Sequence, residues 1–473
     1  MPETETVENL ILGGGEPGKY MAWELAAQGR RTIVIERGLI GGSCPNIACL
    51  PSKNVIHSAK VADLLHHASA YGLRTGPVAT DMEGVREHKR VMVAGLVETH
   101  RKKFAANGLD FILGEGRFVA PRTVEVSLEA GGTRRIEAER VFLDLGTHAS
   151  VPDVPGLANA SPMTPDEILE LGRLPEHLIV LGGGYVGAEF AQAFRRFGSR
   201  VTVVEHGPQL MAREDSDVAE AVRAIFEEDG IEVILGAVTK AVSDHSGDRV
   251  RFQTGTPQGE RTIEGSDVLV AAGRTPNTHG IGLERAGVEL DARGYIKVNE
   301  RLETTAPGVW AMGECAGSPQ FTHAAFDDFR IVRDNLPGGK RSTRGRLVPY
   351  CMFIDPELGR VGLNETQARQ QGVEVRVVTL PMTSVLRAKT LGETRGFLKA
   401  LIDVHSDRIL GFTMLGSGAG EVIAVVQTAM LARLPYTVLR DAIFTHPTMA
   451  EGLNVLFGKV PARKSQSGVP ERM

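Results

Sequence analysis

Two cysteines five positions apart, Cys44 and Cys49, have a spacing that suits a redox-active pair. A disulfide needs Cα atoms within roughly 7 Å of each other, whereas residues i and i+5 of a regular helix lie about 8 Å apart. The pair can therefore close only where the backbone departs from a regular helix. Pro45 suits a first helical turn, and Pro51 is expected to kink the helix. On spacing alone, two buried thiols without chemical function remain an even alternative.

The other two cysteines, Cys315 and Cys351, stand apart from this pair. Four cysteines in 473 residues do not make a disulfide framework, and a close pair in a chain that we expect to be cytoplasmic indicates redox or metal chemistry. Zinc would require two further Cys or His ligands at suitable spacing, which Cys315 and Cys351 do not supply. No metal site is therefore predicted.

Charge and hydropathy patterning exclude several kinds of partner. The formal net charge of −5 gives no reason to expect a nucleic acid or an anionic membrane as partner. Residues 1–8 are acidic and lack the basic and apolar regions of a signal peptide. No run of about 18 apolar residues is present, so no membrane span is expected.

A glycine-rich loop upstream of the cysteines predicts a dinucleotide site. It has the G-x-G-x-x-G spacing, stands between an apolar strand and a helix, and is followed by a second strand that ends in a carboxylate. The glycines let the backbone approach a pyrophosphate at a helix N-terminus, and the carboxylate suits a ribose hydroxyl. The residues are Gly13, Gly15, Gly18 and Glu36, with strands at 9–12 and 31–35 and a helix at 19–28.

The same pattern returns later in the chain. Two such loops imply two nucleotides, which indicates a flavin together with a nicotinamide. The second terminal carboxylate, Glu205, can accept a hydrogen bond from a ribose 2′-hydroxyl but would repel a 2′-phosphate. NADH is therefore favoured over NADPH, although Arg213 is near enough in sequence to keep NADPH open. The repeat comprises Gly182, Gly184, Gly187 and Glu205, with strands at 177–181 and 200–204 and a helix from 184 to 195.

With these motifs in place, the chain resembles the flavoprotein disulfide reductases, which include lipoamide dehydrogenase, glutathione reductase and mercuric reductase. The likeness covers nearly the whole chain and also includes the segments 273–277, 307–314 and 446–451. The C-terminal third is most similar to the bacterial reactive-chlorine-resistance (hypothiocyanous acid reductase) branch. The segments that carry this second likeness are 319–322, 327–332 and 443–448.

The resemblance implies an α/β fold with two Rossmann-like dinucleotide-binding domains and a C-terminal α+β dimerisation domain. The expected boundaries are 1–155 for the first part of the FAD-binding domain, 156–277 for the NAD(P)H-binding domain, 278–344 for the second part of the FAD-binding domain, 345–463 for the dimerisation domain and 464–473 for a tail. Further cofactor-binding positions implied by the resemblance are Gly146, Gly273, Gly313 and Glu314.

The resemblance also assigns roles around the cysteines. Cys49 is expected to face the flavin as a thiolate, and Cys44 to be the thiol that meets the substrate. Lys53 is implied to pair with Glu189 near flavin N5, and Tyr185 matches an aromatic gate over the nicotinamide pocket of several relatives.

The acid–base pair implied by the resemblance is His446 with Glu451. Imidazole gives and takes a proton near neutrality, and a carboxylate on its other nitrogen fixes the tautomer. In the family this histidine comes from the other subunit, so a homodimer is implied.

The sequence departs from the family at several positions. Glu314 stands where relatives usually have Asp, so the longer side chain is expected to shift the flavin or weaken its binding. Ala48 and Pro45 lie against the cysteines and are uncommon there. The chain also lacks the N-terminal metal-binding domain and the C-terminal cysteine pair of mercuric reductases.

The favoured function is an FAD-dependent enzyme that passes electrons from NADH, or less favourably NADPH, through FAD to Cys44 and Cys49. The acceptor is then a disulfide or a small oxidant such as hypothiocyanous acid. The alternatives are dihydrolipoamide dehydrogenase, a mercuric or copper ion reductase, and a flavoprotein with a binding role and idle cysteines.

Overall fold

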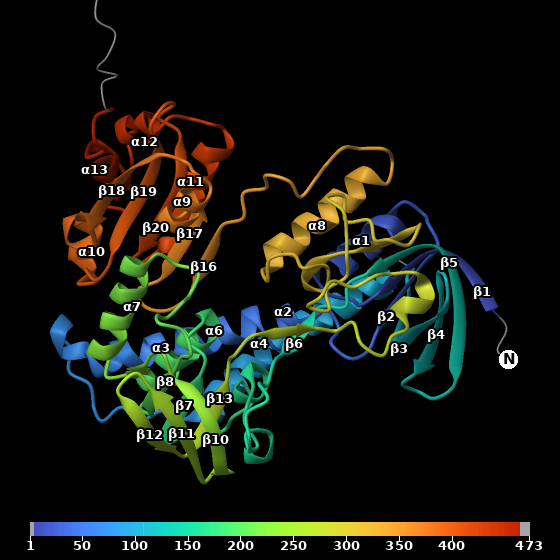
Figure 1. Ribbon diagram of the computed structural model, residues 1–473, viewed down its shortest axis with the longest axis horizontal. Coiled ribbons are helices and arrows are strands. Elements are labelled where there is room, and N and C mark those ends of the chain that lie inside the picture. Colours follow the sequence, from blue (N-terminus) through green and yellow to red (C-terminus); the bar gives the residue numbers. More distant parts are fainter. Residues whose placement is uncertain (1–3, 107, 464–473) are drawn as a thin grey trace, which may run out of the picture.

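The computed structural model describes residues 4–106 and 108–463, so the predicted tail at 464–473 lies outside the described residues. Figure 1 shows three lobes: a largely blue and cyan sheet at the right, a green sheet at the lower left, and an orange and red sheet at the upper left. Within the described part of the chain, none of the helices combines the length and apolar character needed to cross a membrane.

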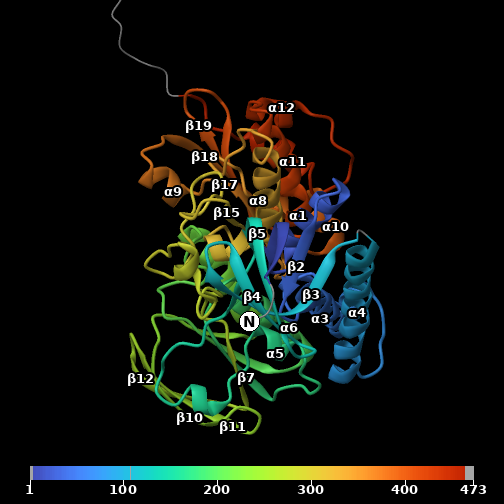
Figure 2. The ribbon, with the colours of Figure 1, turned by 90° about the vertical axis from the view of Figure 1, so that its right-hand side faces the viewer.

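The N-terminal lobe is a six-stranded sheet in the order β1-β2-β3-β4-β5-β15, in which β1 also pairs with β5. Its central strands are parallel and buried on both faces. A strand buried on both faces needs apolar side chains at nearly every position, as in β1, where Leu10 and Ile11 are both fully buried. Helix α1 packs against α8, and α4 lies beside β3 (Figure 2), where Phe104 contacts Phe111 with ring centroids 4.4 Å apart. The strands are β1 (Thr4–Leu12), β2 (Thr32–Glu36), β3 (Asp110–Ala120), β4 (Thr123–Leu128), β5 (Thr133–Leu143) and β15 (Val309–Ala311), and the helices are α1 (Glu16–Ala27), α4 (Met82–Ala106) and α8 (Thr322–Asn335).

The second lobe repeats this plan on a smaller scale. Its parallel sheet has the order β13-β7-β8-β9, and a separate antiparallel sheet of β10, β11 and β12 adjoins it. Helix α6 has one strongly apolar face, with Phe190 and Phe194 buried against the sheet. The strands are β7 (His177–Leu181), β8 (Arg200–Val204), β9 (Glu232–Ile234), β10 (Val238–His245), β11 (Arg249–Thr256), β12 (Gly259–Gly265) and β13 (Asp267–Val270), and the helices are α5 (Pro165–Ile168), α6 (Tyr185–Phe197) and α7 (Ser216–Glu228).

The cysteine-bearing segment connects these two lobes. Helix α3 (Cys49–His66) follows the short α2 (Ser43–Asn46), and its buried residues Val55 and Ala59 share one core with α6 of the second lobe. A two-stranded ribbon of β6 (Thr147–Ala149) and β14 (Arg274–Pro276) forms a further connection.

The C-terminal lobe is an antiparallel sheet in the order β16-β17-β20-β19-β18, packed against α11 and α13. Its edge strand β18 alternates between buried and less buried residues, as expected where one face of a strand meets the core, whereas β17, β19 and β20 are almost continuously buried. The strands are β16 (Tyr350–Met352), β17 (Leu358–Gly362), β18 (Val375–Pro381), β19 (Phe397–Asp403) and β20 (Ile409–Leu415), and the helices are α9 (Glu365–Gln370), α10 (Leu386–Leu391), α11 (Ala419–Leu431), α12 (Tyr436–Asp441) and α13 (Gly452–Gly458).

The predicted fold class is confirmed, but the predicted kink at Pro51 is wrong. Helix α2 ends at Asn46, and α3 begins only at Cys49, so the chain breaks between the two cysteines. Pro51 then falls in the first turn of α3, where its missing N–H leaves no helical hydrogen bond unmade. The departure from a regular helix therefore comes from the break and not from a proline within the helix.

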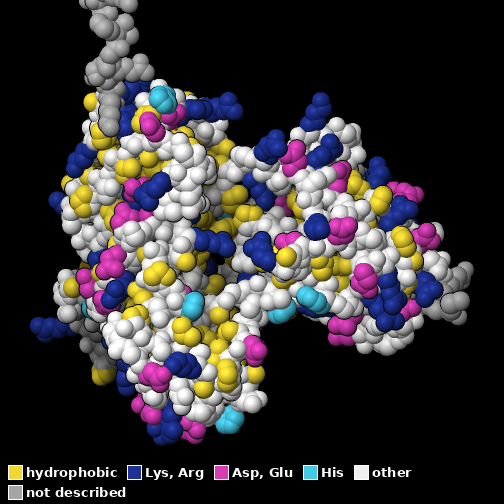
Figure 3. All heavy atoms as spheres, viewed as in Figure 1, with side chains coloured by type: hydrophobic (Ala, Val, Ile, Leu, Met, Phe, Trp, Pro, Cys, Tyr) yellow, Lys and Arg dark blue, Asp and Glu magenta, His cyan; other side chains and the backbone are white. Residues whose placement is uncertain are grey.

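Charges of both signs are mixed over the face of the molecule in Figure 3, which is hollowed between the C-terminal lobe and the N-terminal lobe. The described surface on this side therefore offers no extended field of one sign.

Candidate active site

The break between α2 and α3 brings the two cysteines together at the edge of the central cavity. Both thiols are half-buried and free of any disulfide. The hydroxyl of Thr322, the first residue of α8, lies 3.3 Å from the sulfur of Cys49. The two sulfurs are also close enough to share a hydrogen bond.

The surroundings shift the pKa values of the two thiols in opposite directions. The hydrogen bond from the Cys44 thiol, the Thr322 hydroxyl and the charge of Lys53 together lower the pKa of Cys49 to about 6, against the effect of burial. The same hydrogen bond and burial raise the pKa of Cys44 above its usual range. Near neutral pH, Cys49 is therefore a thiolate and Cys44 its hydrogen-bond donor.

Lys53 and Glu189 form an ion pair next to these thiols. Lys53 Nζ lies 2.7 Å from Glu189 Oε2, and the Glu189 side chain is only 4% exposed. The other carboxylate oxygen accepts a hydrogen bond from the backbone N–H of Phe353 at 2.8 Å. Because the carboxylate is held from both sides, the position of the ammonium group is fixed.

The carboxylate beside the first glycine loop, that of Glu36, is held in place by backbone N–H groups. Glu36 Oε2 accepts a hydrogen bond from Gly14 N–H at 2.8 Å, and Oε1 accepts from Gly38 and Leu39 N–H. These bonds fix the side chain at the carboxyl end of β2, where a nucleotide ribose lies in this fold.

The second loop repeats this arrangement. Glu205 accepts from the N–H groups of Gly183 and Gly207, at 2.5 and 2.6 Å. Like Glu36, it therefore turns a fixed carboxylate toward the space beside its loop. Arg213 and His206 also line that space.

One cavity of about 1700 Å³ connects both loops and the cysteines. Its size, and the N-termini of α1 and α6 that follow the two loops, fit FAD together with a nicotinamide nucleotide. Three loop glycines, Gly13, Gly18 and Gly187, lie behind the cavity wall, where an added Cβ would come within 2.3 Å of a backbone oxygen. The predicted residues that line the cavity are Gly15, Glu36, Cys44, Cys49, Lys53, Gly146, Gly182, Gly184, Tyr185, Glu189, Glu205, Gly273, Gly313 and Glu314.

The unusual Glu314 contacts the β6–β14 ribbon. Its carboxylate accepts a hydrogen bond from the Thr147 hydroxyl and lies 3.3 Å from Arg274 Nε. Arg274 also donates to the Thr147 carbonyl at 2.9 Å. The additional methylene therefore allows a contact with the β6–β14 ribbon that connects the two lobes.

Tyr185 is held in the cavity wall by a buried carboxylate. Its ring stacks on that of Tyr350 with centroids 5.4 Å apart, and both hydroxyls donate to Glu214. Arg360 Nε, 3.3 Å from the other Glu214 oxygen, balances the charge.

His446 and Glu451 are paired with each other but lie away from this cavity. His446 Nδ1 is 2.9 Å from Glu451 Oε1, and the imidazole side chain is 64% exposed. Neither residue lines the cavity that contains Cys44 and Cys49 of the same chain. Within one chain, the structure therefore does not bring the predicted acid–base pair to the cysteines.

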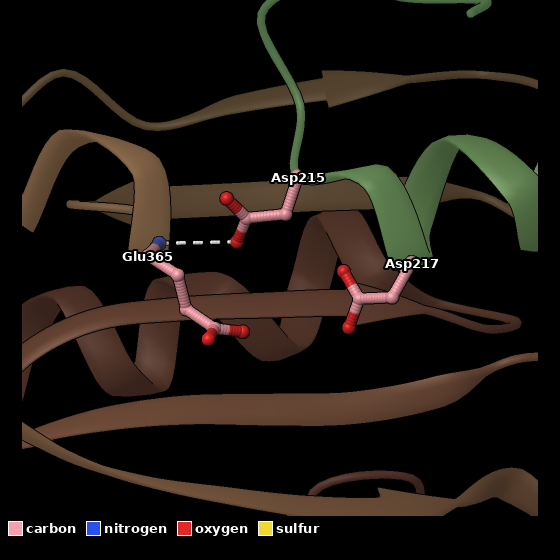
Figure 4. Close-up of side chains that lie close together, drawn as sticks. All are labelled: Asp215, Asp217 and Glu365. Carbon is pink, nitrogen blue, oxygen red and sulfur yellow. Dashed lines mark hydrogen bonds between the residues drawn. The ribbon is translucent and has the colours of Figure 1, made fainter. Parts of the chain in front are cut away.

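A separate acidic cluster lies between the second and C-terminal lobes (Figure 4). Carboxylates of Asp215, Asp217 and Glu365 approach one another there. The ammonium group of the buried Lys399 lies 2.7–2.9 Å from all three, so it already supplies the positive charge that the cluster needs.

Two residues in contact with the predicted site were not identified from the sequence. Thr322 contacts Cys49, and Asp144 accepts a hydrogen bond from Gly18 N–H at 2.9 Å. Thr322 lay within a segment used only for resemblance, and Asp144 is the residue directly after β5. A polar residue at the carboxyl end of a buried parallel strand is the signal that could have identified Asp144.

A cavity shared by two dinucleotide loops and a pair of close cysteines defines the class of flavoprotein disulfide reductases. The chain belongs to the pyridine nucleotide-disulphide oxidoreductase family, whose model matches residues 8–328 and whose dimerisation domain matches residues 348–456.

Individual relatives cover almost the whole chain. The probable pyridine nucleotide-disulfide oxidoreductase RclA of Escherichia coli is 38% identical over 458 residues, which span 95% of this chain and 98% of that protein. A dihydrolipoyl dehydrogenase of Thermus scotoductus is 34% identical, with 95% and 96% covered, and a mercuric reductase of Streptomyces lividans is 33% identical, with 96% of each covered. The solved Cu(II) complex of the HOCl-induced flavoprotein disulfide reductase RclA has a TM-score of 0.88 at 37% identity and covers 96% of this chain and 99% of that one.

The predictions of family, fold class and enzyme class are thus confirmed. The protein is an FAD-dependent oxidoreductase that uses a pyridine nucleotide, and its dimerisation domain supports a homodimer.

Proposed function

We propose that the enzyme transfers electrons from NADH to Cys44 and Cys49 and then to a small oxidant such as hypothiocyanous acid. The observation that carries this proposal is the position of both cysteines at the wall of the cavity that both loops share, with the Thr322 hydroxyl 3.3 Å from the Cys49 sulfur. The similar RclA of Escherichia coli is described as a HOCl-induced flavoprotein disulfide reductase, which supports a small oxidant as the class of acceptor.

FAD, when bound, carries two electrons from the nicotinamide to the disulfide. The reduced pair then holds a thiolate at Cys49, stabilised by Thr322 and Lys53, and a thiol at Cys44. Transfer of the Cys44 proton to a base makes that sulfur the nucleophile toward substrate.

With hypothiocyanous acid, the Cys44 sulfur forms a bond to the substrate sulfur, and hydroxide leaves and is protonated to water. The Cys49 thiolate then attacks Cys44, thiocyanate leaves, and the disulfide forms. Two electrons have passed from the thiols to the substrate, and the products are thiocyanate and water.

We assign the proton transfers to His446 of the partner subunit in a homodimer. The imidazole is held by Glu451 and exposed on its own chain, as a group that serves a neighbouring subunit must be. Its Nε2 is the atom left to exchange a proton, because Nδ1 faces the carboxylate.

NADH is preferred in this proposal because Glu205 presents a fixed carboxylate beside the second loop. A ribose hydroxyl can donate to that carboxylate, whereas a 2′-phosphate would face like charge.

The test is an anaerobic titration of the purified enzyme with NADH, followed by its visible spectrum. A long-wavelength thiolate–flavin band in the two-electron-reduced enzyme is expected. Bleaching without this band would place the cysteines out of contact with FAD and would contradict the proposal.

Turnover with lipoamide, glutathione disulfide, hypothiocyanous acid, Cu²⁺ and Hg²⁺ then identifies the acceptor. We expect the highest kcat/KM with hypothiocyanous acid and its loss in Cys44→Ser. Higher efficiency with lipoamide or a metal ion would replace the proposed substrate with that one.

A further inference from the structure

The two glycine loops share their backbone hydrogen bonds, which makes them comparable position by position. Asp144 N–H donates to Leu12 O at 2.8 Å in the first loop, and Ala271 N–H donates to Leu181 O at 2.9 Å in the second. The first loop therefore has an aspartate where the second has an alanine, each one residue after its strand.

The carboxyl group of Asp144 fills the space beneath the first loop. Oδ2 accepts from Gly18 N–H at 2.9 Å, and a Cβ added at Gly15 would lie 2.6 Å from the same oxygen. A Cβ added at Gly313 would lie 3.5 Å from Oδ1. The group thus stands between the glycine loop and the Gly313 turn, both of which line the cavity.

The corresponding space in the second loop is open. A Cβ added at Gly184, the counterpart of Gly15, would meet no atom within 4 Å. The loop geometry itself does not require the carboxyl group of Asp144, because the second loop adopts the same geometry without such a group.

Asp144 lies in surroundings that oppose a negative charge. The residue is 9% exposed and receives one hydrogen bond, from Gly18. The titratable groups around it are Glu16, Lys19, Glu36, Cys315 and Asp328.

The one cation among these groups is already engaged. Lys19 Nζ lies 2.7 Å from Glu16 and donates to the Gly41 carbonyl. Burial, followed by the charge of Glu36, raises the pKa of Asp144 well above its usual range.

We propose that Asp144 is a neutral carboxylic acid whose O–H donates a hydrogen bond to the pyrophosphate of FAD. A pyrophosphate at the N-terminus of α1 carries negative charge close to the loop. An ionised Asp144 would repel it, whereas a protonated one adds a donor that the second loop lacks. Asp144 is then a cofactor-positioning residue, and the inference is independent of the oxidant reduced.

The sign of the pH effect follows from this assignment. Bound FAD favours the protonated form of Asp144, so loss of that proton weakens FAD binding. FAD release from the enzyme should therefore accelerate as the pH rises through the pKa of Asp144.

The experiment measures FAD release from the full-length holoenzyme after dilution into FAD-free buffer, followed by flavin fluorescence over a pH series. Asp144→Asn keeps an N–H donor without charge, so release should stay slow at every pH. Asp144→Ala removes the donor, and release should be about tenfold faster and independent of pH, as expected for loss of one hydrogen bond to a charged group. The wild type should match the Asn variant at low pH and release FAD faster at high pH.

An infrared difference spectrum, wild type minus Asp144→Asn, reports the proton directly. A protonated carboxyl C=O band is expected in the holoenzyme. If this band is absent, or if the Ala variant retains FAD as long as the Asn variant, the inference is wrong. Thermal unfolding of each variant without FAD separates a loss of folding from a loss of binding.

Discussion

The two glycine loops have nearly the same backbone but differ in what surrounds them. Each is a strand, a G-x-G-x-x-G turn and a helix, with a carboxylate fixed by loop N–H groups at the end of the next strand. Beneath the first loop lies Asp144, and in the same place beneath the second lies Ala271. The helix of the second loop also begins with Tyr185, whose hydroxyl is bound to Glu214.

This comparison teaches that one motif can serve two binding tasks. FAD stays with the enzyme, whereas the nicotinamide nucleotide must enter and leave in each cycle. The additional polar group is under the loop for the resident cofactor, and the tyrosine is beside the loop for the transient one. On the proposed roles, residues outside the glycine motif adjust retention and exchange, while the motif itself provides the binding loop.

The largest expected effect comes from breaking each loop in turn. Gly13 and Gly182 both have positive φ, and an added Cβ would lie 2.0 and 2.5 Å from the backbone oxygens of Asp144 and Ala271. Gly13→Ala should reduce FAD content by at least about tenfold, because strain and a backbone clash together cost several kcal/mol. Gly182→Ala should retain FAD but lose reduction by NADH. The absorbance of bound flavin and stopped-flow reduction measure the two effects, and equal loss of FAD in both variants would contradict the separation of tasks.

A smaller effect is expected when each ribose carboxylate loses its charge. Glu205→Gln should lower the ratio of kcat/KM for NADH to that for NADPH by roughly tenfold, because the repulsion of the 2′-phosphate is removed. Glu36→Gln is the matched change in the first loop and should leave this ratio unchanged. Steady-state kinetics with both nucleotides provide the measurement. An unchanged ratio in Glu205→Gln would remove the basis for a preference for NADH.

The cysteines between the loops give an intermediate effect that depends on pH. Because the pKa of Cys49 is lowered to about 6, its thiolate is present above that pH and is lost as the pH falls through it. Thr322→Val removes one hydrogen bond to the thiolate and should raise the midpoint by about one pH unit. Thr322→Ser retains the hydroxyl and should keep the wild-type midpoint. The thiolate–flavin band of the reduced enzyme, titrated with pH, distinguishes these results.

The smallest effect is expected from giving the second loop a side chain like that of the first. Ala271→Asn adds a polar group beneath the Gly182 loop, where space is open below Gly184. The KM for NADH should change by a few fold, about the effect of one neutral hydrogen bond, while FAD release stays at the wild-type rate. A change in FAD release instead would show that the two loops are not independent.

Local patterns in the sequence were sufficient for the loops and the cysteines, because a tight turn with positive φ and a close helix approach require glycine at fixed spacing. A departure from a regular helix at the cysteines was predicted, but it was attributed to a kink at Pro51. It comes instead from the break between α2 and α3, because a proline can stand in the first turn of a helix as well as interrupt one. Asp144 and Thr322 were missed for another reason. Their partners, Gly18 and Cys49, are 126 and 273 positions away, and contacts at such separations cannot be read from the sequence. Only Asp144 had a local signal, its place at the carboxyl end of a buried parallel strand.

The exposed pair of His446 and Glu451 has a consequence for how activity depends on protein concentration. On the proposed arrangement, one polypeptide carries halves of two different catalytic units, so specific activity should decline when dilution separates the subunits. Two inactive preparations, Cys44→Ser and His446→Ala, should complement each other after subunit exchange. An equal mixture would recover about a quarter of the intact units, since half of the random pairs are mixed and each mixed pair contains one complete unit. On this arrangement a single subunit has no complete catalytic unit, so turnover should require the assembled dimer.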